Sequence, residues 1–179
     1  MPKAENAFEL DKIQVRIDEE STVSPKASDE DRKPGLQLDV SFTGSNDFLS
    51  MLHPSLKSAL YQKRTKEPTQ GELALADANA LSERRFDFIT KPISLDREYT
   101  GYDIEVEYGF DEKSNLKTDG VTLDNFKIKL LEGGSVLYQF RIIMHLDAKT
   151  HGQLAQQKNE NIVITLSAPE ASQQELEAA

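Results

Sequence analysis

The fold is decided by residues 126–140, which read FKIKLLEGGSVLYQF. Apolar residues occupy every second position on both sides of Gly133 and Gly134, a period typical of strands with one buried face. A two-residue turn at these glycines puts the apolar residues of the two strands on opposite faces. A three-residue turn over residues 132–134 pairs them all on one face: Leu130 with Val136, Ile128 with Tyr138, and Phe126 with Phe140. We therefore predict an antiparallel hairpin with the longer turn, a left-handed glycine and a bulge.

The same period of two recurs along most of the chain. The apolar positions of the other expected strands are Ile13, Val15 and Ile17; Leu36, Leu38, Val40 and Phe42; Phe86 and Phe88; Tyr102, Ile104, Val106, Tyr108 and Phe110; and Ile162, Ile164 and Leu166. The return strand of the hairpin continues the pattern through Ile142 and Met144. The strand at Phe86 and Phe88 is expected to end at Pro92, with both rings facing the core. Strands therefore dominate the predicted core.

Two segments break this period and predict helices. Apolar residues recur at every third and fourth position over residues 46–62, after capping residues at 45–47. Pro54 must either begin a second helical piece or kink this helix. Residues 72–83, rich in Ala and Leu, predict a second helix, and Asp147 is placed to cap a short third one before the last strand. The pattern predicts an α+β fold, with a mainly antiparallel sheet that is curved or forms a partial barrel. Two helices follow its second strand.

Composition divides the chain into one domain and two flanking segments. Residues 1–35 combine the first strand with a linker over residues 21–35, which hold two prolines and one aliphatic residue and predict a mobile segment. Residues 36–167 are expected to form a single globular α+β domain. Residues 168–179 are expected to form an acidic C-terminal tail. A chain of 179 residues suits one such domain.

Absent residue types and motifs exclude several classes of protein. The chain has no cysteine, which excludes disulfide frameworks, thiolate metal sites and cysteine nucleophiles. It has no apolar run long enough to cross a bilayer and no secretion signal at its start, so we expect a cytoplasmic protein without membrane contact. Glycine-rich phosphate loops, a nucleophile elbow and an H-E-x-x-H helix are also missing. These absences favour a protein without enzymatic activity or a cofactor.

The net charge of −10 is unevenly distributed. Residues 98–134 hold nine acidic and four basic residues, whereas residues 57–97 hold six acidic and eight basic ones. Strong overall acidity argues against general binding to duplex DNA, which depends on Lys and Arg neutralising phosphates. Each segment contains one candidate binding surface.

The acidic candidate surface is expected to bind the basic surface of a protein partner. Its residues are Asp103, Glu105, Glu107, Asp111 and Glu112. The first three alternate along one strand and project from the same face, about 7 Å apart. Carboxylates so placed can hold Mg²⁺ or Ca²⁺. Their alternation with buried residues favours a solvated face instead, paired with Lys127 and Lys129 on the neighbouring strand.

The basic candidate surface is the alternative site and is suited to single-stranded nucleic acid. Its residues are Lys57, Lys63, Arg64, Lys66, Arg84, Arg85, Lys91 and Arg97, interleaved with Tyr61, Phe86, Phe88 and Tyr99. In such a groove the charges follow the backbone and the bases stack on aromatic rings. The pattern nevertheless favours a solvated helix end and linker, because Phe86 and Phe88 are expected in the core.

The histidines give a third candidate. His145, Asp147 and His151 offer two imidazoles and a carboxylate, a set that can ligate a transition metal. A helix cap at Asp147 between two exposed histidines explains the same pattern, and we predict no metal there. His53 is expected to lie at the start of a helix.

Two stretches carry a resemblance to known proteins. They are residues 52–61, LHPSLKSALY, and residues 133–145, GGSVLYQFRIIMH. They resemble uncharacterised small proteins of tailed bacteriophages that are encoded near DNA replication or recombination genes, over about residues 36–167. The resemblance includes no functional motif, so it assigns no functional residue. It implies a bacterial cytoplasmic setting and a non-enzymatic accessory role.

Three hypotheses follow. The first is an accessory protein that binds a protein partner of a phage or host DNA-processing machine, in the extreme case as an acidic inhibitor that imitates DNA charge. The second is a single-strand-binding accessory protein that uses residues 57–97. The third is a metal-dependent enzyme at His145, Asp147 and His151. A second copy of the chain can also pair at an unprotected strand edge.

Overall fold

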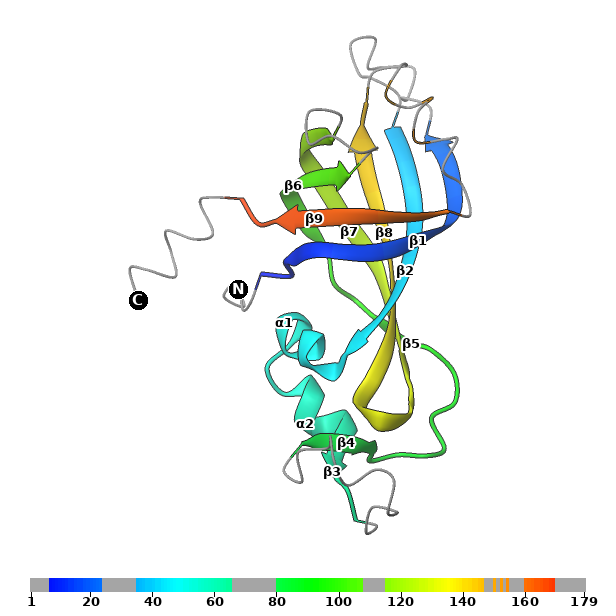
Figure 1. Cartoon of the computed structure of the whole chain (residues 1–179), viewed down its shortest axis with the longest axis vertical. Coiled ribbons are helices and arrows are strands. Elements are labelled where there is room, and N and C mark those ends of the chain that lie inside the picture. Colours follow the sequence, from blue (N-terminus) through cyan, green and yellow to red (C-terminus); the bar gives the residue numbers. More distant parts are fainter. Residues whose placement is uncertain are drawn as a thin grey trace, which may run out of the picture.

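The chain forms a closed β-barrel with a smaller extension (Figure 1). The computed structural model describes residues 7–23, 35–65, 80–107, 115–146, 150, 152, 154 and 160–169. The barrel strands are β1 (Leu10–Val23), β2 (Gly35–Ser45), β6 (Tyr99–Glu107), β7 (Leu116–Leu130), β8 (Ser135–His145) and β9 (Asn161–Ser167). Around the barrel they run in the order β1, β2, β8, β7, β6 and β9, and each pair of neighbours is antiparallel. The predicted α+β class with a mainly antiparallel sheet is confirmed.

Closure of the barrel depends on β9, which lies between the first strand and β6. Ile164 is paired with Ile13 of β1 on one side and with Val106 of β6 on the other. The sheet therefore curves until its ends meet, where the sequence predicted a curved sheet or a partial barrel. One further strand, β5 (Ile93–Leu95), pairs with β7 beyond the end of β6 and is the terminal strand of the sheet.

The alternating apolar residues fill the barrel interior, as their period predicted. The buried positions on four of the strands are Leu36, Leu38, Val40 and Phe42; Tyr102, Ile104 and Val106; Val136, Tyr138, Phe140, Ile142 and Met144; and Ile162, Ile164 and Leu166. Phe8, which no strand pattern included, is completely buried among the rings of Tyr99, Phe126 and Phe140. Its main-chain N–H donates a hydrogen bond to the Tyr102 hydroxyl over 3.1 Å. The residue before β1 is therefore part of the core.

The hairpin between β7 and β8 has the predicted three-residue turn. Leu130 is paired with Val136, and Ile128 with Tyr138. The turn residues Glu132–Gly134 lie between them, and both glycines adopt left-handed conformations, with φ of 71° and 78°. The register shift in this pair lies between Asp124 and Lys127, away from the turn, and the Phe126 and Phe140 rings stack with centroids 5.4 Å apart.

The turn end of this hairpin carries a set of short elements. We call these elements and the turn end of the hairpin the arm. They are the 3₁₀ turn η1 (Asn46–Phe48), α1 (Leu49–Leu52), α2 (Leu56–Leu60), β3 (Tyr61–Lys63), β4 (Leu81–Arg84) and β5. The helix predicted over residues 46–62 is thus broken at Pro54, and its last two residues belong to β3. The Tyr61 hydroxyl lies 2.7 Å from the Ser135 carbonyl oxygen, which fastens β3 to the hairpin.

Some predicted elements differ from the structure or lie outside the described residues. The helix predicted over residues 72–83 is wrong at its end, because residues 81–83 are in β4, which pairs with β3; residues 72–79 lie outside the described chain. Residues 21–23, assigned to the linker, extend β1 because they pair with β2, and residues 24–34 are not described. Thr150, Gly152 and Leu154 are helical, in agreement with a short helix before the last strand.

Ala168, assigned to the C-terminal tail, is buried, and its N–H donates to a carboxylate oxygen of Glu9 over 3.1 Å. Other predicted positions fall outside the described residues. These positions are Tyr108, Phe110, Asp147 and residues 170–179.

Candidate functional site

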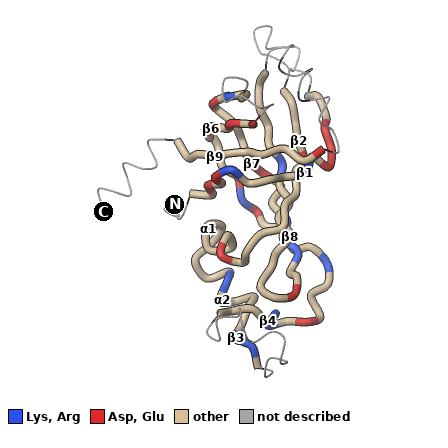
Figure 2. Tube along the Cα trace, viewed as in Figure 1, with Lys and Arg blue, Asp and Glu red and all other residues tan. Residues whose placement is uncertain are grey.

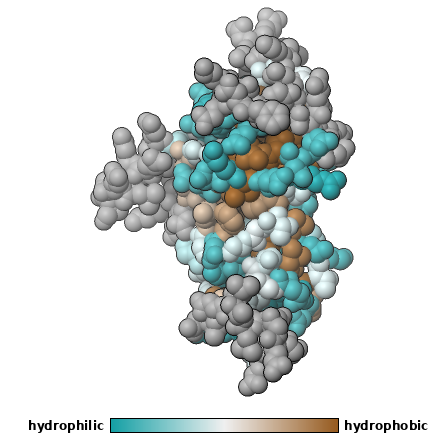
Figure 3. Space-filling view, in the orientation of Figure 1, coloured by the Kyte–Doolittle hydropathy of each residue, from teal (hydrophilic) through white to brown (hydrophobic). Residues whose placement is uncertain are grey.

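The charged groups of the described barrel lie on its outer surface, because the inward positions are apolar or aromatic and buried. Figure 3 shows hydrophilic residues on either side of an apolar area on one face of the barrel. One hollow on this outer surface measures about 520 Å³ and lies over β6, β7 and β9. It includes Asp103 and Glu105 of the predicted acidic surface. We call it the acidic groove.

The acidic groove has an excess of negative charge. Its lining residues are Asp103, Ile104, Glu105, Lys117, Thr118, Asp119, Thr165 and Ser167, which comprise three carboxylates and one ammonium group. The carboxylate of Glu105 accepts a hydrogen bond from the Asn115 amide over 2.8 Å and lies 3.0 Å from the Lys117 ammonium. These two contacts lower the pKa of Glu105 and keep it ionised near neutral pH. Asp103 and Asp119 are both exposed.

The prediction that Lys127 and Lys129 face these carboxylates is wrong. Glu105 is paired with Lys117, and Glu107 lies 3.3 Å from Lys12 of β1. Lys127 is instead paired with Ser94 of β5 and with Gln139 of β8. The reason is the length of β7, whose first half faces β6 and whose second half faces β5. Lys129 belongs to that second half, while Asp111 and Glu112 lie outside the described residues.

Two further hollows flank a bulge in β7 at Asn125. One, of about 260 Å³, is lined by Asp18, Glu19, Asp39, Val40, Asn125, Lys127, Gln139 and Phe140. The other, of about 450 Å³, is lined by Ser94, Leu95, Asp96, Arg97, Glu98, Asp124, Asn125 and Arg141. Both contain three carboxylates, against one basic side chain in the first and two in the second. All three hollows are therefore lined by more acidic than basic residues. The sequence did not predict the latter two, because their carboxylates come from separate strands and from the loop between β5 and β6.

A row of charges crosses four strands between these two hollows. Arg141 of β8 binds Asp124 of β7 through two hydrogen bonds of 2.7 and 2.8 Å. On its other side Arg141 is paired with Asp39 of β2, which is in turn paired with Glu19 of β1. Burial raises the pKa of Asp39, as does the negative charge of Glu19, while Arg141 opposes the shift. Negative charge is thus crowded on this part of the barrel.

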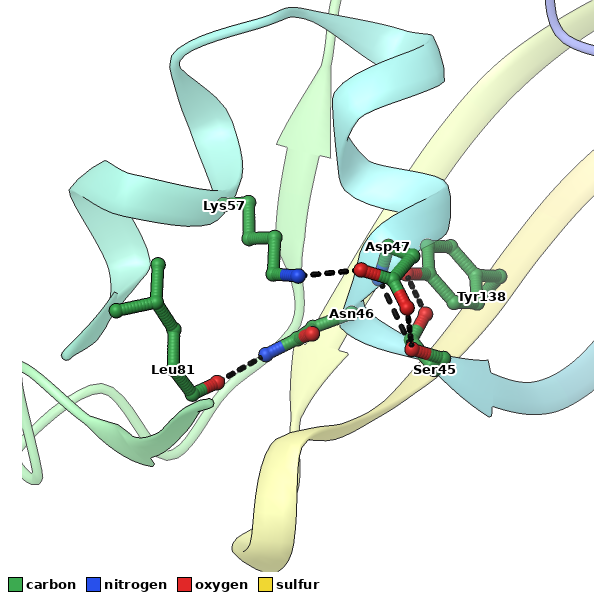
Figure 4. A network of polar contacts seen from close by, with 6 residues as sticks. All are labelled: Ser45, Asn46, Asp47, Lys57, Leu81 and Tyr138. Atoms are coloured by element: carbon green, nitrogen blue, oxygen red, sulfur yellow. Dashed lines mark hydrogen bonds and ion pairs between the residues drawn. The ribbon is translucent and has the colours of Figure 1, made fainter. Parts of the chain in front are cut away.

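The basic candidate residues are spread over the molecule, and several are paired. Lys57 contacts Asp47 (Figure 4), and Arg84 lies 2.6 Å from Glu132. Arg97 lines a hollow on the barrel, whereas the others that the structure describes follow the arm: Lys57, Lys63, Arg64, Arg84, Arg85 and Lys91. Figure 2 shows basic and acidic positions close to one another along the arm. Lys66 lies outside the described residues.

The strand predicted at Phe86 and Phe88 is wrong. β4 ends at Arg84, and the chain turns so that the N–H of Ile89 donates to the carbonyl of Phe86 over 3.2 Å. The two rings were expected in the core, yet Phe88 is 80% exposed and Phe86 is 37% exposed. Two apolar residues at alternate positions are too short a pattern to distinguish a strand from a turn.

The proposed metal ligands do not form a site within the described chain. His145 is exposed at the end of β8, and both Asp147 and His151 lie outside the described residues. Among the described residues, no group of three or more potential ligands is placed to hold a metal ion. His53 follows α1, and its Nδ1 accepts a hydrogen bond from the N–H of Ser55, just before α2.

The comparisons with known proteins add no relative. No family model, curated protein or solved structure matches this chain. Within the described part of the chain, the helices are all too short or too polar to cross a lipid bilayer.

Proposed function

We propose that this chain is a non-enzymatic accessory protein that binds a protein partner through the carboxylate-lined outer surface of its barrel. The supporting observation is the excess of carboxylates in all three hollows described above. Such a surface complements a basic partner surface. Complementary charge increases the rate of association and makes binding more selective for the right partner. It repels the phosphates of nucleic acid.

The partner is a component of a phage or host DNA-processing machine in the bacterial cytoplasm. This part of the proposal rests on the resemblance of residues 52–61 and 133–145 to small phage proteins. Proteins that act on DNA present basic surfaces to it, so an acidic barrel can occupy such a surface and inhibit DNA binding. Inhibition by occupation requires no catalytic residue.

The test is capture of the partner from cells of the encoding organism with the full chain as bait. The variant Asp103→Asn with Asp119→Asn removes two exposed carboxylates from the acidic groove. The matched control, Asp11→Asn with Glu20→Gln, removes the same charge from β1 outside the three hollows. We expect the groove variant to retain less partner than the control, and added salt to weaken the wild-type complex. Equal retention by both variants contradicts the use of this groove.

Single-stranded nucleic-acid binding remains the second candidate, and one observation favours it. The exposure of Phe86 and Phe88 provides two rings on which bases can stack, where burial would have prevented it. Titration with a labelled single-stranded oligonucleotide at low and high salt tests this candidate. Binding that weakens as salt is added supports it, and no binding at low salt eliminates it. Metal analysis of the purified protein tests the third candidate, an enzyme at His145, Asp147 and His151.

A further inference from the structure

The turn after β4 exposes two aromatic rings side by side. Phe88 is 80% exposed and Phe86 37%, and their ring centroids are 5.7 Å apart. Among the described residues, no other large apolar side chain is as exposed. A single exposed apolar side chain is ordinary, but an adjacent pair of rings at the end of an extension is typical of a binding surface. We call residues 85–89 the aromatic tip.

The backbone of the aromatic tip is held in place on the arm. The N–H of Arg85 donates to the carbonyl of Leu60 over 2.9 Å, and its guanidinium donates to the carbonyl of Ser58 over 3.1 Å. The turn itself is closed by the hydrogen bond from Ile89 to Phe86. A fixed turn loses less conformational entropy when it binds, so its rings are preorganised for binding.

An exposed carboxylate accompanies the two rings. Asp87 lies between the two phenylalanines in sequence, and its side chain is 85% exposed. The guanidinium of Arg84 lies 3.8 Å from Asp87 but only 2.6 Å from Glu132, so a single cation is shared by two carboxylates. A carboxylate that is only partly neutralised in this way repels a nucleic-acid backbone and attracts a lysine or arginine. These charges favour a protein over a nucleic acid, although Arg85 and exposed Lys91 lie close by in sequence.

We propose that the aromatic tip is a second docking site, which inserts Phe88 and Phe86 into an apolar pocket of a protein and places Asp87 against a basic residue at the rim of that pocket. Aromatic side chains in desolvated pockets carry much of the affinity of protein interfaces. Figure 1 places β4, which precedes the tip, at the opposite end of the molecule from β6 and β9. The tip is therefore separate from the acidic groove, and two separate sites on one chain can bind one large partner with added avidity or bridge two partners.

The first experiment places a photoreactive phenylalanine analogue at position 88 of the full chain in cells of the encoding organism. A matched control places it at exposed Thr43 on β2. We expect one discrete protein adduct at position 88 that is absent at position 43, with the crosslink in an apolar segment that contains lysine or arginine. An adduct with nucleic acid, or no adduct specific to position 88, overturns the proposal.

The second experiment measures the affinity of the purified adduct protein for unlabelled variants of the chain. Phe88→Ser is expected to weaken binding about 30-fold or more, as for a residue that dominates an interface. Phe88→Leu, which still fills an apolar pocket, is expected to retain most of the affinity, and Asp87→Lys is expected to weaken binding about tenfold. Unfolding curves of these variants should match the wild type, because the side chains are exposed. Affinity that is unchanged in Phe88→Ser overturns the proposal.

The same measurement separates this inference from the function proposed for the barrel. If Asp103→Asn with Asp119→Asn has no effect and Phe88→Ser does, the docking tip stands without the acidic groove. The opposite pattern removes the tip and leaves the groove. A single-stranded oligonucleotide of thymidine serves as the nucleic-acid probe. Binding of that probe at low salt that is lost in both Phe88→Ser and Phe88→Leu assigns the rings to base stacking and overturns the docking proposal.

Discussion

The side-chain amide of Asn46 donates a hydrogen bond of 2.6 Å to the main-chain carbonyl of Leu81, 35 residues further along the chain (Figure 4). Asn46 is only 5% exposed, so its polar side chain is buried. Its hydrogen bond joins the start of η1 to the start of β4, which leads directly into the aromatic tip. This buried amide therefore helps to position the tip, together with the contacts of Arg85 to Leu60 and Ser58.

Replacing this amide should destabilise the arm. In Asn46→Ala the Leu81 carbonyl loses its partner, and a buried polar group left unsatisfied costs about 1–3 kcal/mol. We expect a lower midpoint of urea unfolding for Asn46→Ala, and no comparable change for the exposed control Ser94→Ala. Faster hydrogen exchange in β3 and β4 should accompany the loss. Equal midpoints for the two variants would show that other contacts hold β4.

The ion pair between Arg141 and Asp124 should contribute measurably to stability. The two side chains are 31% and 24% exposed, and they share two hydrogen bonds. Lysine cannot reproduce this two-pronged contact, so Arg141→Lys is expected to lower the free energy of unfolding by about 1–2 kcal/mol. Lys12→Gln, which removes an exposed pair with Glu107, should have little effect. A full recovery of Arg141→Lys stability in high salt would contradict this account, because partly buried pairs are screened weakly.

Asp39 should destabilise the fold at neutral pH. Its pKa is raised in the folded state, chiefly by burial, so folding favours the protonated acid. This contribution to stability is complete below the unfolded pKa and is lost as the pH rises through the folded pKa. Asp39→Asn is therefore expected to equal or exceed the wild type in unfolding free energy at pH 7, by no more than about 1 kcal/mol. The gain should shrink as the pH falls toward 3.8. Asp18→Asn is the exposed control, and destabilisation by Asp39→Asn at pH 7 would contradict the prediction.

Tyr102 should make the fold sensitive to alkali. Burial raises its pKa to about 12 from the model-compound value of 10.0. Stability from the protonated phenol is complete below pH 10 and is lost as the pH rises through 12. Tyr102→Phe should show a smaller loss of unfolding free energy over this range than the wild type. At neutral pH it should be less stable by about 1–3 kcal/mol, because the Phe8 N–H loses its acceptor. A neutral-pH stability equal to that of the wild type would show that Phe8 finds another partner.

The parts of the fold that could be predicted are those set by local pattern. The pairing of Leu130 with Val136 follows from apolar alternation and a glycine-rich turn, both readable within fifteen residues. The break at Pro54 follows from the missing N–H of proline in the same way. Closure of the barrel by β9 could not be predicted, because the pairing of Ile164 with Ile13 and Val106 depends on how the whole sheet curves.

The candidate site was predictable in its residue type and less so in its neighbours. The alternation of Asp103 and Glu105 placed both carboxylates on the outer surface, and the structure puts both in the acidic groove. Which lysine faces Glu105 depends on the register of a strand whose first half carried no clear apolar pattern. Phe88 illustrates a different limit, because an apolar residue is usually buried, whereas this one is 80% exposed.

The place of β9 between β1 and β6 imposes an order on biosynthesis. The ribosome makes β1 first, yet β1 cannot gain one of its two neighbouring strands until residues 161–167 have been translated. Until then the apolar faces of the first strands have an open side, and chaperones or a partner have access to them. Pairing between strands so distant in the chain also slows folding. Translation as far as residue 167 must therefore precede the closed form that presents the acidic groove.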